Sequence, residues 1–135
     1  MESPKNYIAE AERYLSNARA ILKTKATATA GQAGNGVPGY YSDSKYVKMA
    51  CNTGWSGVLV ALDAKIVSPP KEQRKSVKTY QDYLSSRNKK ILNDFISGYN
   101  HLHLYGGYDG ELNKKTIQIG MELAENIIEW CRDNC

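Results

Sequence analysis

The feature that most constrains the fold is a stripe of small residues inside an otherwise apolar helical stretch, residues 43–67. Its members recur at alternating steps of four and three: Ala50, Gly54, Gly57, Ala61 and Ala64. Two glycines inside a helix each cost about 1 kcal/mol relative to alanine, so the stripe needs a compensating contact. Close approach of another helix supplies one. That helix belongs either to the same chain or to a second copy, so Ala50, Gly54, Gly57 and Ala61 form a candidate interface.

Apolar residues at helical spacing cover most of the chain and predict an all-α protein. We expect four helices, over residues 4–25, 43–67, 71–104 and 110–133. Ser3 and Pro4 are typical of a helix start, and the polar run Ser85–Asn88 predicts a kink in the third helix. Residues 26–39 are rich in glycine and alanine, so we expect a flexible loop there. Short turns after the second and third helices predict an antiparallel up-and-down four-helix bundle.

Composition places the chain among ordinary globular proteins of one domain, here residues 1–135. Hydrophobic residues make up 41% and charged residues 24% of the sequence. The start carries no apolar leader, and the longest apolar run is Val58–Leu62, so we expect a cytoplasmic protein without membrane contact. Three cysteines without a Cys-x-x-Cys spacing argue against a disulfide framework or a zinc site. We therefore expect no metal and no cofactor.

The formal charge of +4 is unevenly distributed. Residues 71–90 hold seven basic side chains against two acidic ones. Such a stretch can meet an anionic partner such as RNA or a nucleotide, or it can be a solvated helix face. If it binds an anion, the candidate residues are Lys75, Lys78, Lys89 and Lys90.

Both histidines of the chain lie in residues 99–110, which read Tyr-Asn-His-Leu-His-Leu-Tyr-Gly-Gly-Tyr-Asp-Gly. On a regular helix His103 lies on the same side as Tyr99, toward the helix seam, and His101 lies on a more polar side. His103 is then either a histidine at the edge of the core or a group that transfers a proton. His101 is expected to be exposed. Two residues apart, they do not suit a shared metal site.

The end of this stretch adds candidate binding residues. Asp109 can cap the next helix, whose first amides could hold an anion. Tyr105 and Tyr108 can stack on a base, or they can seal the end of a bundle. Together with His101 and Tyr99, Tyr108 and Asp109 are candidate ligand contacts. The sequence contains neither a Ser-His-Asp order nor the paired Glu-x-x-His motifs of a di-iron bundle.

Two motifs carry a family resemblance: Tyr41-Ser42-Asp43-Ser44-Lys45-Tyr46-Val47 and Leu102-His103-Leu104-Tyr105-Gly106-Gly107-Tyr108-Asp109-Gly110. With the small-residue helix, they resemble an uncharacterised family of small bacterial helical bundles. These are in turn similar to the HEPN superfamily. Active HEPN members are metal-independent ribonucleases, usually dimeric, with an Arg four to six residues before a His. The resemblance implies His103 and Tyr105 as catalytic candidates, but this sequence has Gly98 where a toxin branch of the superfamily has that Arg.

Three functions follow as hypotheses. The first is a non-catalytic HEPN-like bundle that associates as a homodimer or with a protein partner. The second is an RNA- or nucleotide-directed enzyme that uses His103 and Tyr105. The third is a regulatory RNA binder without turnover, as in a toxin–antitoxin pair.

Overall fold

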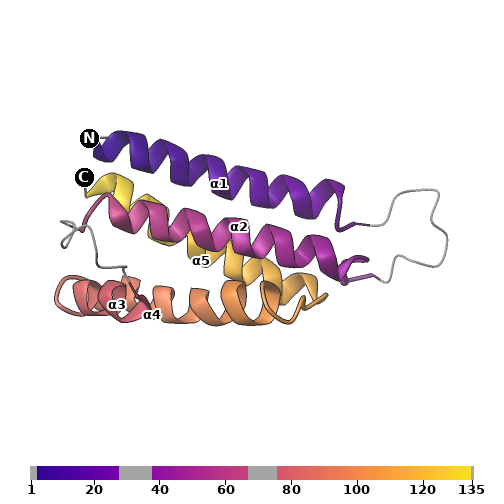
Figure 1. Ribbon diagram of the computed structural model, residues 1–135. Coiled ribbons are helices and arrows are strands. Elements are labelled where there is room, and N and C mark those ends of the chain that lie inside the picture. Colours follow the sequence, from indigo (N-terminus) through magenta and orange to yellow (C-terminus); the bar gives the residue numbers. More distant parts are fainter. Residues whose placement is uncertain (1–2, 28–37, 67–75, 135) are drawn as a thin grey trace.

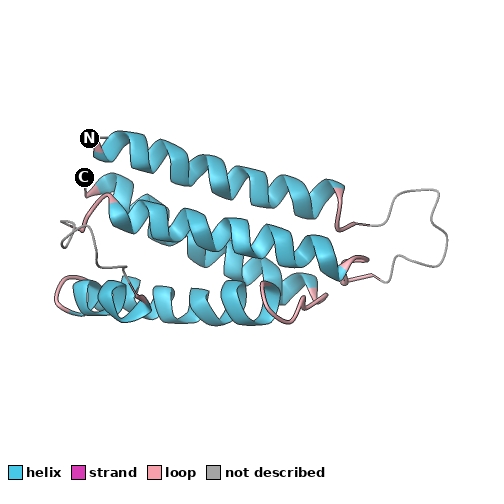
Figure 2. Ribbon diagram, in the orientation of Figure 1, coloured by secondary structure: helices cyan, strands magenta, loops and turns pink. Residues whose placement is uncertain are grey.

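The computed structural model describes residues 3–27, 38–66 and 76–134, and within these ranges every regular element is a helix. Figure 2 shows the helices and the loops that connect them. Five are α-helices and one, η1, is a π-helix: α1 (Pro4–Thr24), α2 (Ser44–Asp63), α3 (Val77–Ser85), α4 (Lys89–Gly98), η1 (Tyr99–Gly106) and α5 (Lys114–Asp133). The predicted all-α class is confirmed for the described residues.

Helices α2 and α5 form the centre of the fold. Helix α2 contacts α1, α5 and η1, and α5 contacts α1, α2, α4 and η1. Figure 1 shows α1 and α2 side by side, α5 behind α2, and α3, α4 and η1 along the other side of α2. The start of α1 and the end of α5 lie at the same end of the molecule, where the Arg132 guanidinium lies 3.0 Å from a carboxylate oxygen of Glu12. Within the described ranges, no helix is both long and apolar enough to cross a bilayer.

The small-residue stripe of α2 packs against helices of the same chain. A methyl group at Gly57 would lie 3.0 Å from the carbonyl oxygen of Ala11 and 3.1 Å from Cβ of Tyr14. A methyl group at Gly54 would lie 3.3 Å from the sulfur of Met121. Ala50 and Ala61 are fully buried in the same core. At Gly57 and Gly54 the candidate interface is thus occupied by α1 and α5 of this chain, and Ala50 and Ala61 are buried inside the same core.

The expected third helix is divided where the sequence is polar. Helix α3 ends at Ser85, and the side chain of Asn88 caps α4 by accepting a hydrogen bond from the amide of Ile91, 3.0 Å away. The expected ends at residues 67 and 71 lie outside the described residues, as does most of the 26–39 loop. Because Ser76 forms a capping box with Thr79, α3 begins at Val77.

The last helix begins later than expected. Asn113, not Asp109, caps α5, because its side-chain oxygen accepts a hydrogen bond from the amide of Thr116, 3.1 Å away. Gly110 has a φ of +68°, which breaks the helix before that cap. The amide of Asp109 instead donates to the carbonyl of Leu104, so this residue belongs to the turn that follows η1.

Candidate functional site

Both histidines lie on the π-helix η1, which the 3.6-residue periodicity of the sequence did not predict. The amide of Gly107 donates to the carbonyl of Leu102 at 2.7 Å, and that of Asp109 donates to Leu104 at 2.9 Å. These bonds join residues five apart, the π-helical pattern. Since π-helical turns occur frequently at functional sites, η1 is a candidate functional segment.

Three glycines allow η1 to lie directly against α2 and α5. A methyl group at Gly106 would collide with the sulfur of Cys51, and one at Gly107 would lie 2.5 Å from the side-chain oxygen of Asn52. On α5, a methyl group at Gly120 would lie 2.8 Å from Leu102 and 3.0 Å from Cβ of His101. The Asn52 amide also donates to the carbonyl of Gly107 at 3.3 Å. The packing on both sides therefore fixes the position of η1.

His103 lies at the outer end of an aromatic cluster. Its ring stacks on Tyr99, with ring centroids 5.0 Å apart and planes at 24°. The ring centroid of Trp55, on α2, lies 5.7 Å from that of Tyr99 and 6.4 Å from that of His103. Trp55 is buried, Tyr99 is half-buried and His103 is exposed. The expected proximity of His103 to Tyr99 is thus present, with the imidazole in contact with solvent.

His101 is half-buried, and the expectation of an exposed side chain is wrong. Its Nδ1 lies 2.8 Å from the carbonyl oxygen of Ser97. Because a carbonyl oxygen only accepts, we infer that Nδ1 carries the proton, which leaves Nε2 as an acceptor in the neutral ring. The ring also packs edge-on against that of Tyr105, with ring centroids 5.5 Å apart. Gly120 makes room for this arrangement, a long-range contact that helical spacing alone does not reveal.

The candidate catalytic pair of His103 and Tyr105 is divided between two ring contacts. Tyr105 contacts His101, whereas His103 contacts Tyr99. Tyr108 is 79% exposed, and Asp109 is exposed beside it. Among the described side chains, no group of three potential metal ligands comes together. The stretch therefore presents two separate aromatic pairs on its surface.

The candidate basic residues are only partly placed by the structure. Lys75 lies outside the described residues. The ammonium group of Lys78 lies 2.6 Å from Asp82, and that of Lys90 lies 3.1 Å from Asp94, each on the following turn of its own helix. Lys89 is exposed. Local carboxylates thus offset two of the charges that were candidates for contact with an anionic partner.

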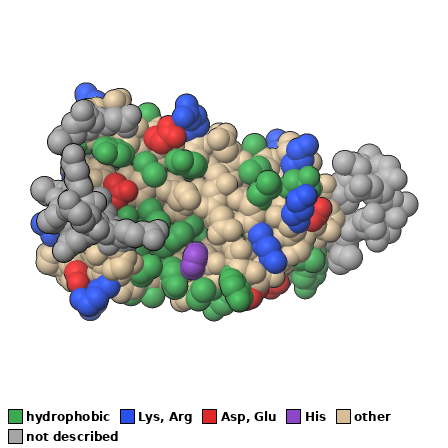
Figure 3. All heavy atoms as spheres, in the orientation of Figure 1, with side chains coloured by type: hydrophobic (Ala, Val, Ile, Leu, Met, Phe, Trp, Pro, Cys, Tyr) green, Lys and Arg blue, Asp and Glu red, His purple; other side chains and the backbone are tan. Residues whose placement is uncertain are grey.

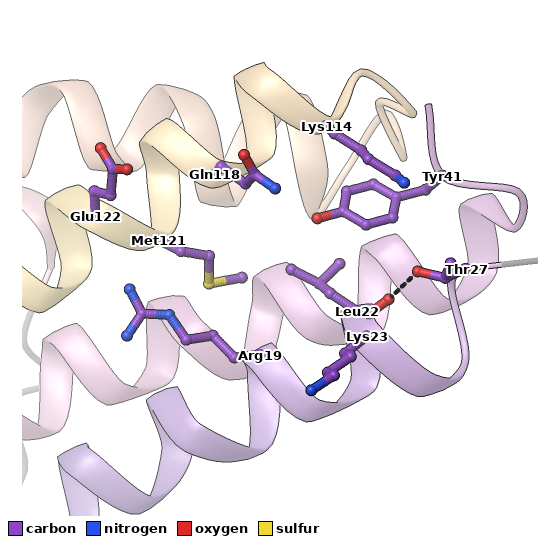
Figure 4. Close-up of a pocket in the computed structure, with 9 residues that line it drawn as sticks. All are labelled: Arg19, Leu22, Lys23, Thr27, Tyr41, Lys114, Gln118, Met121 and Glu122. Carbon is purple, nitrogen blue, oxygen red and sulfur yellow. Dashed lines mark hydrogen bonds between the residues drawn. The ribbon is translucent and has the colours of Figure 1, made fainter. Parts of the chain in front are cut away.

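A pocket that the sequence did not predict lies between α1, the start of α5 and Tyr41 (Figure 4). Its charged members are Arg19, Lys23, Lys114 and Glu122. They come from two helices that are about 90 residues apart in the sequence, and no local motif connects them. The only sequence signal near the pocket was Tyr41, in the first of the two motifs.

Residues 6–133 match the family described as a domain of unknown function (DUF5618). A solved structure described as a protein of unknown function from Dyadobacter fermentans is 41% identical in sequence. The match covers 99% of this chain and 100% of that one, with a TM-score of 0.86. No curated protein matches the chain. The predicted resemblance to an uncharacterised family is confirmed, and the more distant HEPN resemblance stays a prediction.

Proposed function

The chain belongs to the family described as a domain of unknown function (DUF5618), and we propose that it acts by association, as a non-catalytic, HEPN-like homodimer. In this proposal α3, α4 and η1 together form the third arm of a four-helix bundle whose other arms are α1, α2 and α5. The contacts of α4 with α5 and of η1 with α2 and α5 support that arrangement.

The position that would hold the superfamily's arginine supports a non-catalytic role. Gly98 is buried, and a methyl group there would lie 3.7 Å from Cζ3 of Trp55 and 3.9 Å from Cβ of Leu123. A side chain at this position starts toward the core, against Trp55 and Leu123. An arginine there would also place a charge against apolar atoms, which is costly. This observation carries the proposal that the chain associates rather than cleaves RNA.

The surface around His103 has the composition of a protein interface. We define the His103 face as Met49 and Asn52 of α2 together with Ile96, Tyr99 and His103. Met49 is 49% exposed and Ile96 is 41% exposed, each three residues before another member of the face. Figure 3 shows a histidine among hydrophobic side chains on the side of the molecule seen in Figure 1. Methionine and aromatic residues are enriched at interfaces.

The aromatic members of this face are already held in place. Tyr99 and His103 are in contact with one another and with the buried Trp55. Side chains that are ordered before binding lose less conformational entropy when a partner arrives. A second copy of the chain can therefore use this face without first having to order it.

Sedimentation velocity over a range of protein concentrations tests the proposal. We expect a dimer whose dissociation constant rises at least tenfold in Ile96→Glu, because interface anchors contribute about 2 kcal/mol or more. Ile119→Glu is the matched control, since Ile119 is 42% exposed on α5 and lies outside the His103 face. A monomer at every concentration, or equal weakening by both variants, would contradict the proposal.

The second candidate is an RNA- or nucleotide-binding protein. Such a protein could act as a metal-independent ribonuclease or as a component of a toxin–antitoxin pair. Exposed Tyr105 and Tyr108 favour it, because exposed aromatic rings can stack on unpaired bases. Incubation with labelled single-stranded RNA and tRNA in EDTA tests cleavage, beside His103→Ala and His101→Ala. Cleavage that His103→Ala abolishes would replace the association proposal, whereas intact RNA and no binding at low salt would exclude this candidate.

A further inference from the structure

The pocket between α1 and α5 contains none of the residues of η1 or of the His103 face, so its role is independent of the proposed function. Its volume is about 350 Å³. Nine residues line it: Arg19, Leu22, Lys23, Thr27, Tyr41, Lys114, Gln118, Met121 and Glu122. Figure 4 shows these side chains arriving from both helices and from the segment that carries Tyr41.

The floor of the pocket is apolar. Leu22, Tyr41 and Met121 are all buried members of the core. Figure 4 places the sulfur of Met121 and the side chain of Leu22 between the two helices, with the Tyr41 hydroxyl directed toward the same space. Burial raises the pKa of the Tyr41 hydroxyl, and the side chain of Gln118 partly offsets this rise. A ligand with an apolar part would therefore meet an apolar surface with one neutral hydroxyl at its edge.

The wall beside Tyr41 is fixed by backbone hydrogen bonds. The amide of Tyr41 donates to the carbonyl of Leu112 at 2.8 Å, and the amide of Lys114 donates to the carbonyl of Gly39 at 2.9 Å. The amide of Ser42 donates to Ala26, just beyond α1, at 2.7 Å. These bonds join the end of α1, the start of α5 and the segment between α1 and α2. The pocket is thus formed before any ligand binds, as small-molecule sites usually are.

The rim of the pocket is predominantly cationic. The lining contains three cationic residues, Arg19, Lys23 and Lys114, and one carboxylate, Glu122. Lys114 extends over Tyr41, with its nitrogen 5.6 Å from the ring centroid. It also lies in the first turn of α5, where the helix dipole favours a negative charge.

Arg19 remains able to bind a second anion. One of its terminal nitrogens lies 2.6 Å from a carboxylate oxygen of Glu125, and both side chains of this pair are about 40% exposed. A pair this exposed is weak. The guanidinium group has five N–H donors, so it can contact a ligand while it keeps or loses this partner. An incoming carboxylate or phosphate could accept hydrogen bonds from it in a bidentate manner.

We propose that this pocket binds a small organic anion, in which a carboxylate or phosphate group is joined to an apolar body. Figure 4 shows Arg19 and Lys114 on either side of Leu22 and Met121. The apolar body would therefore lie on Leu22 and Met121, and the anionic group would lie at one end of the pocket, against Arg19 or against Lys114. The volume of about 350 Å³ is at the lower end of the range for small-molecule sites, which suits a ligand of about ten to fifteen non-hydrogen atoms.

Three probes of equal chain length test the charge requirement: octanoate, octyl phosphate and the uncharged octanamide. Titrations are followed by the amide resonances of ¹⁵N-labelled protein, and we expect shifts at Lys23, Tyr41 and Gln118. At least one anionic probe should bind tenfold or more tightly than octanamide, and the better of the two identifies the anionic group. Equal binding of all three, or no binding up to millimolar concentration, would overturn the proposal. Inorganic phosphate alone should bind more weakly than octyl phosphate, and equal binding would exclude a role for the apolar floor.

Variants of the rim test the position of the anion. Arg19→Gln or Lys114→Gln, depending on which cation holds the anionic group, should weaken binding of the better anionic probe at least fivefold while the circular dichroism spectrum is unchanged. Lys78→Gln is the matched control, because Lys78 pairs with Asp82 on α3, outside the pocket. If both rim variants bind as tightly as the unaltered protein, or if Lys78→Gln weakens binding equally, the proposal is wrong. Ile96→Glu should bind the probe normally, which separates this result from that of the dimer experiment.

Discussion

His103 stacks on Tyr99 with ring centroids 5.0 Å apart, while His101, two residues earlier, makes its ring contact with Tyr105. The two histidines of one short helix therefore have different aromatic partners. Each pair joins residues four apart, which are neighbours on the surface of a helix. Any chemistry assigned to one histidine is thus separate from that of the other.

This pairing predicts selective changes in the imidazole proton resonances. Protons held over the face of an aromatic ring are shielded, so His103 should be shifted upfield by Tyr99 and Trp55. Tyr99→Leu should move the His103 resonances downfield and leave those of His101 in place. Tyr105→Leu should shift the His101 resonances and leave those of His103 in place. The measurement is a two-dimensional NMR spectrum of the histidine side chains. Tyr108→Leu is the control, and a change at both histidines in either variant would contradict the pairing.

A second prediction concerns the glycine at the end of η1. Gly106→Ala should lower the free energy of unfolding by about 1–3 kcal/mol, because the new methyl group would overlap the side chain of Cys51. Gly98→Ala is the control, since the nearest atom to its methyl group would be 3.7 Å away and its φ of −62° is helical. We expect this control to be neutral or to raise stability by about 0.4–1 kcal/mol. Urea unfolding measures both, and similar losses in the two variants would show that close packing at Cys51 is not the cause.

Local signals in the sequence predicted the helical class and several helix ends. Ser3 caps α1 as expected, and Asp43 caps α2 at the start of the expected helix over residues 43–67. The polar run Ser85–Asn88 is the end of one helix and the start of the next. Capping depends on residues two or three apart, so a single sequence contains the necessary information. The small-residue stripe predicted a close helix contact, but a stripe by itself does not tell which helix approaches it. The structure shows α1 and α5 of the same chain.

The π-helix and the pocket depend on contacts that sequence reading does not supply. The packing of Gly106 on Cys51 joins residues 55 positions apart, and that of His101 on Gly120 joins two different helices. Apolar spacing in residues 99–106 suits an α-helix as well as a π-helix, because Leu102 points into the core in both. The pocket combines Arg19 with Lys114, each of which is an ordinary surface cation in its own helix. Only the crossing of α1 and α5 brings them together.

A third prediction follows from the burial of Cys51. Burial raises the pKa of this thiol from 9.0 to about 12. In the unfolded chain it loses its proton near pH 9, so above that pH the unfolded state binds fewer protons and stability falls as the pH rises. We expect a loss of up to about 1.4 kcal/mol per pH unit from this group between pH 9 and 12. Urea unfolding at pH 8, 9 and 10 should show this slope, and Cys51→Ala should reduce it. An identical slope in the variant would assign the pH dependence to other groups, such as Tyr80, whose pKa burial also raises.

The same burial predicts a slow reaction of Cys51 with alkylating reagents. The thiolate is the reactive form, and burial both disfavours it and excludes the reagent. Mass spectrometry after brief treatment with iodoacetamide should find Cys51 modified in urea and unmodified in the native protein. Cys131 is also buried and serves as an internal comparison. Rapid modification of native Cys51 would show that η1 opens away from α2 under native conditions, in conflict with the tight contact at Gly106.

The last prediction tests the division of the expected third helix. Asn88→Ala should lower the free energy of unfolding by about 1 kcal/mol, because it removes the acceptor for the amide of Ile91 at the start of α4. Asn93→Ala is the matched control, since Asn93 is exposed within the same helix and alanine is the better helix former there. We expect the control to be neutral or slightly stabilising in the same urea experiment. A neutral Asn88→Ala would contradict this prediction. One way to offset the lost cap is for α3 and α4 to join into one continuous helix. The number of residues with helical ¹³Cα chemical shifts between Ser85 and Lys90 would then rise in that variant.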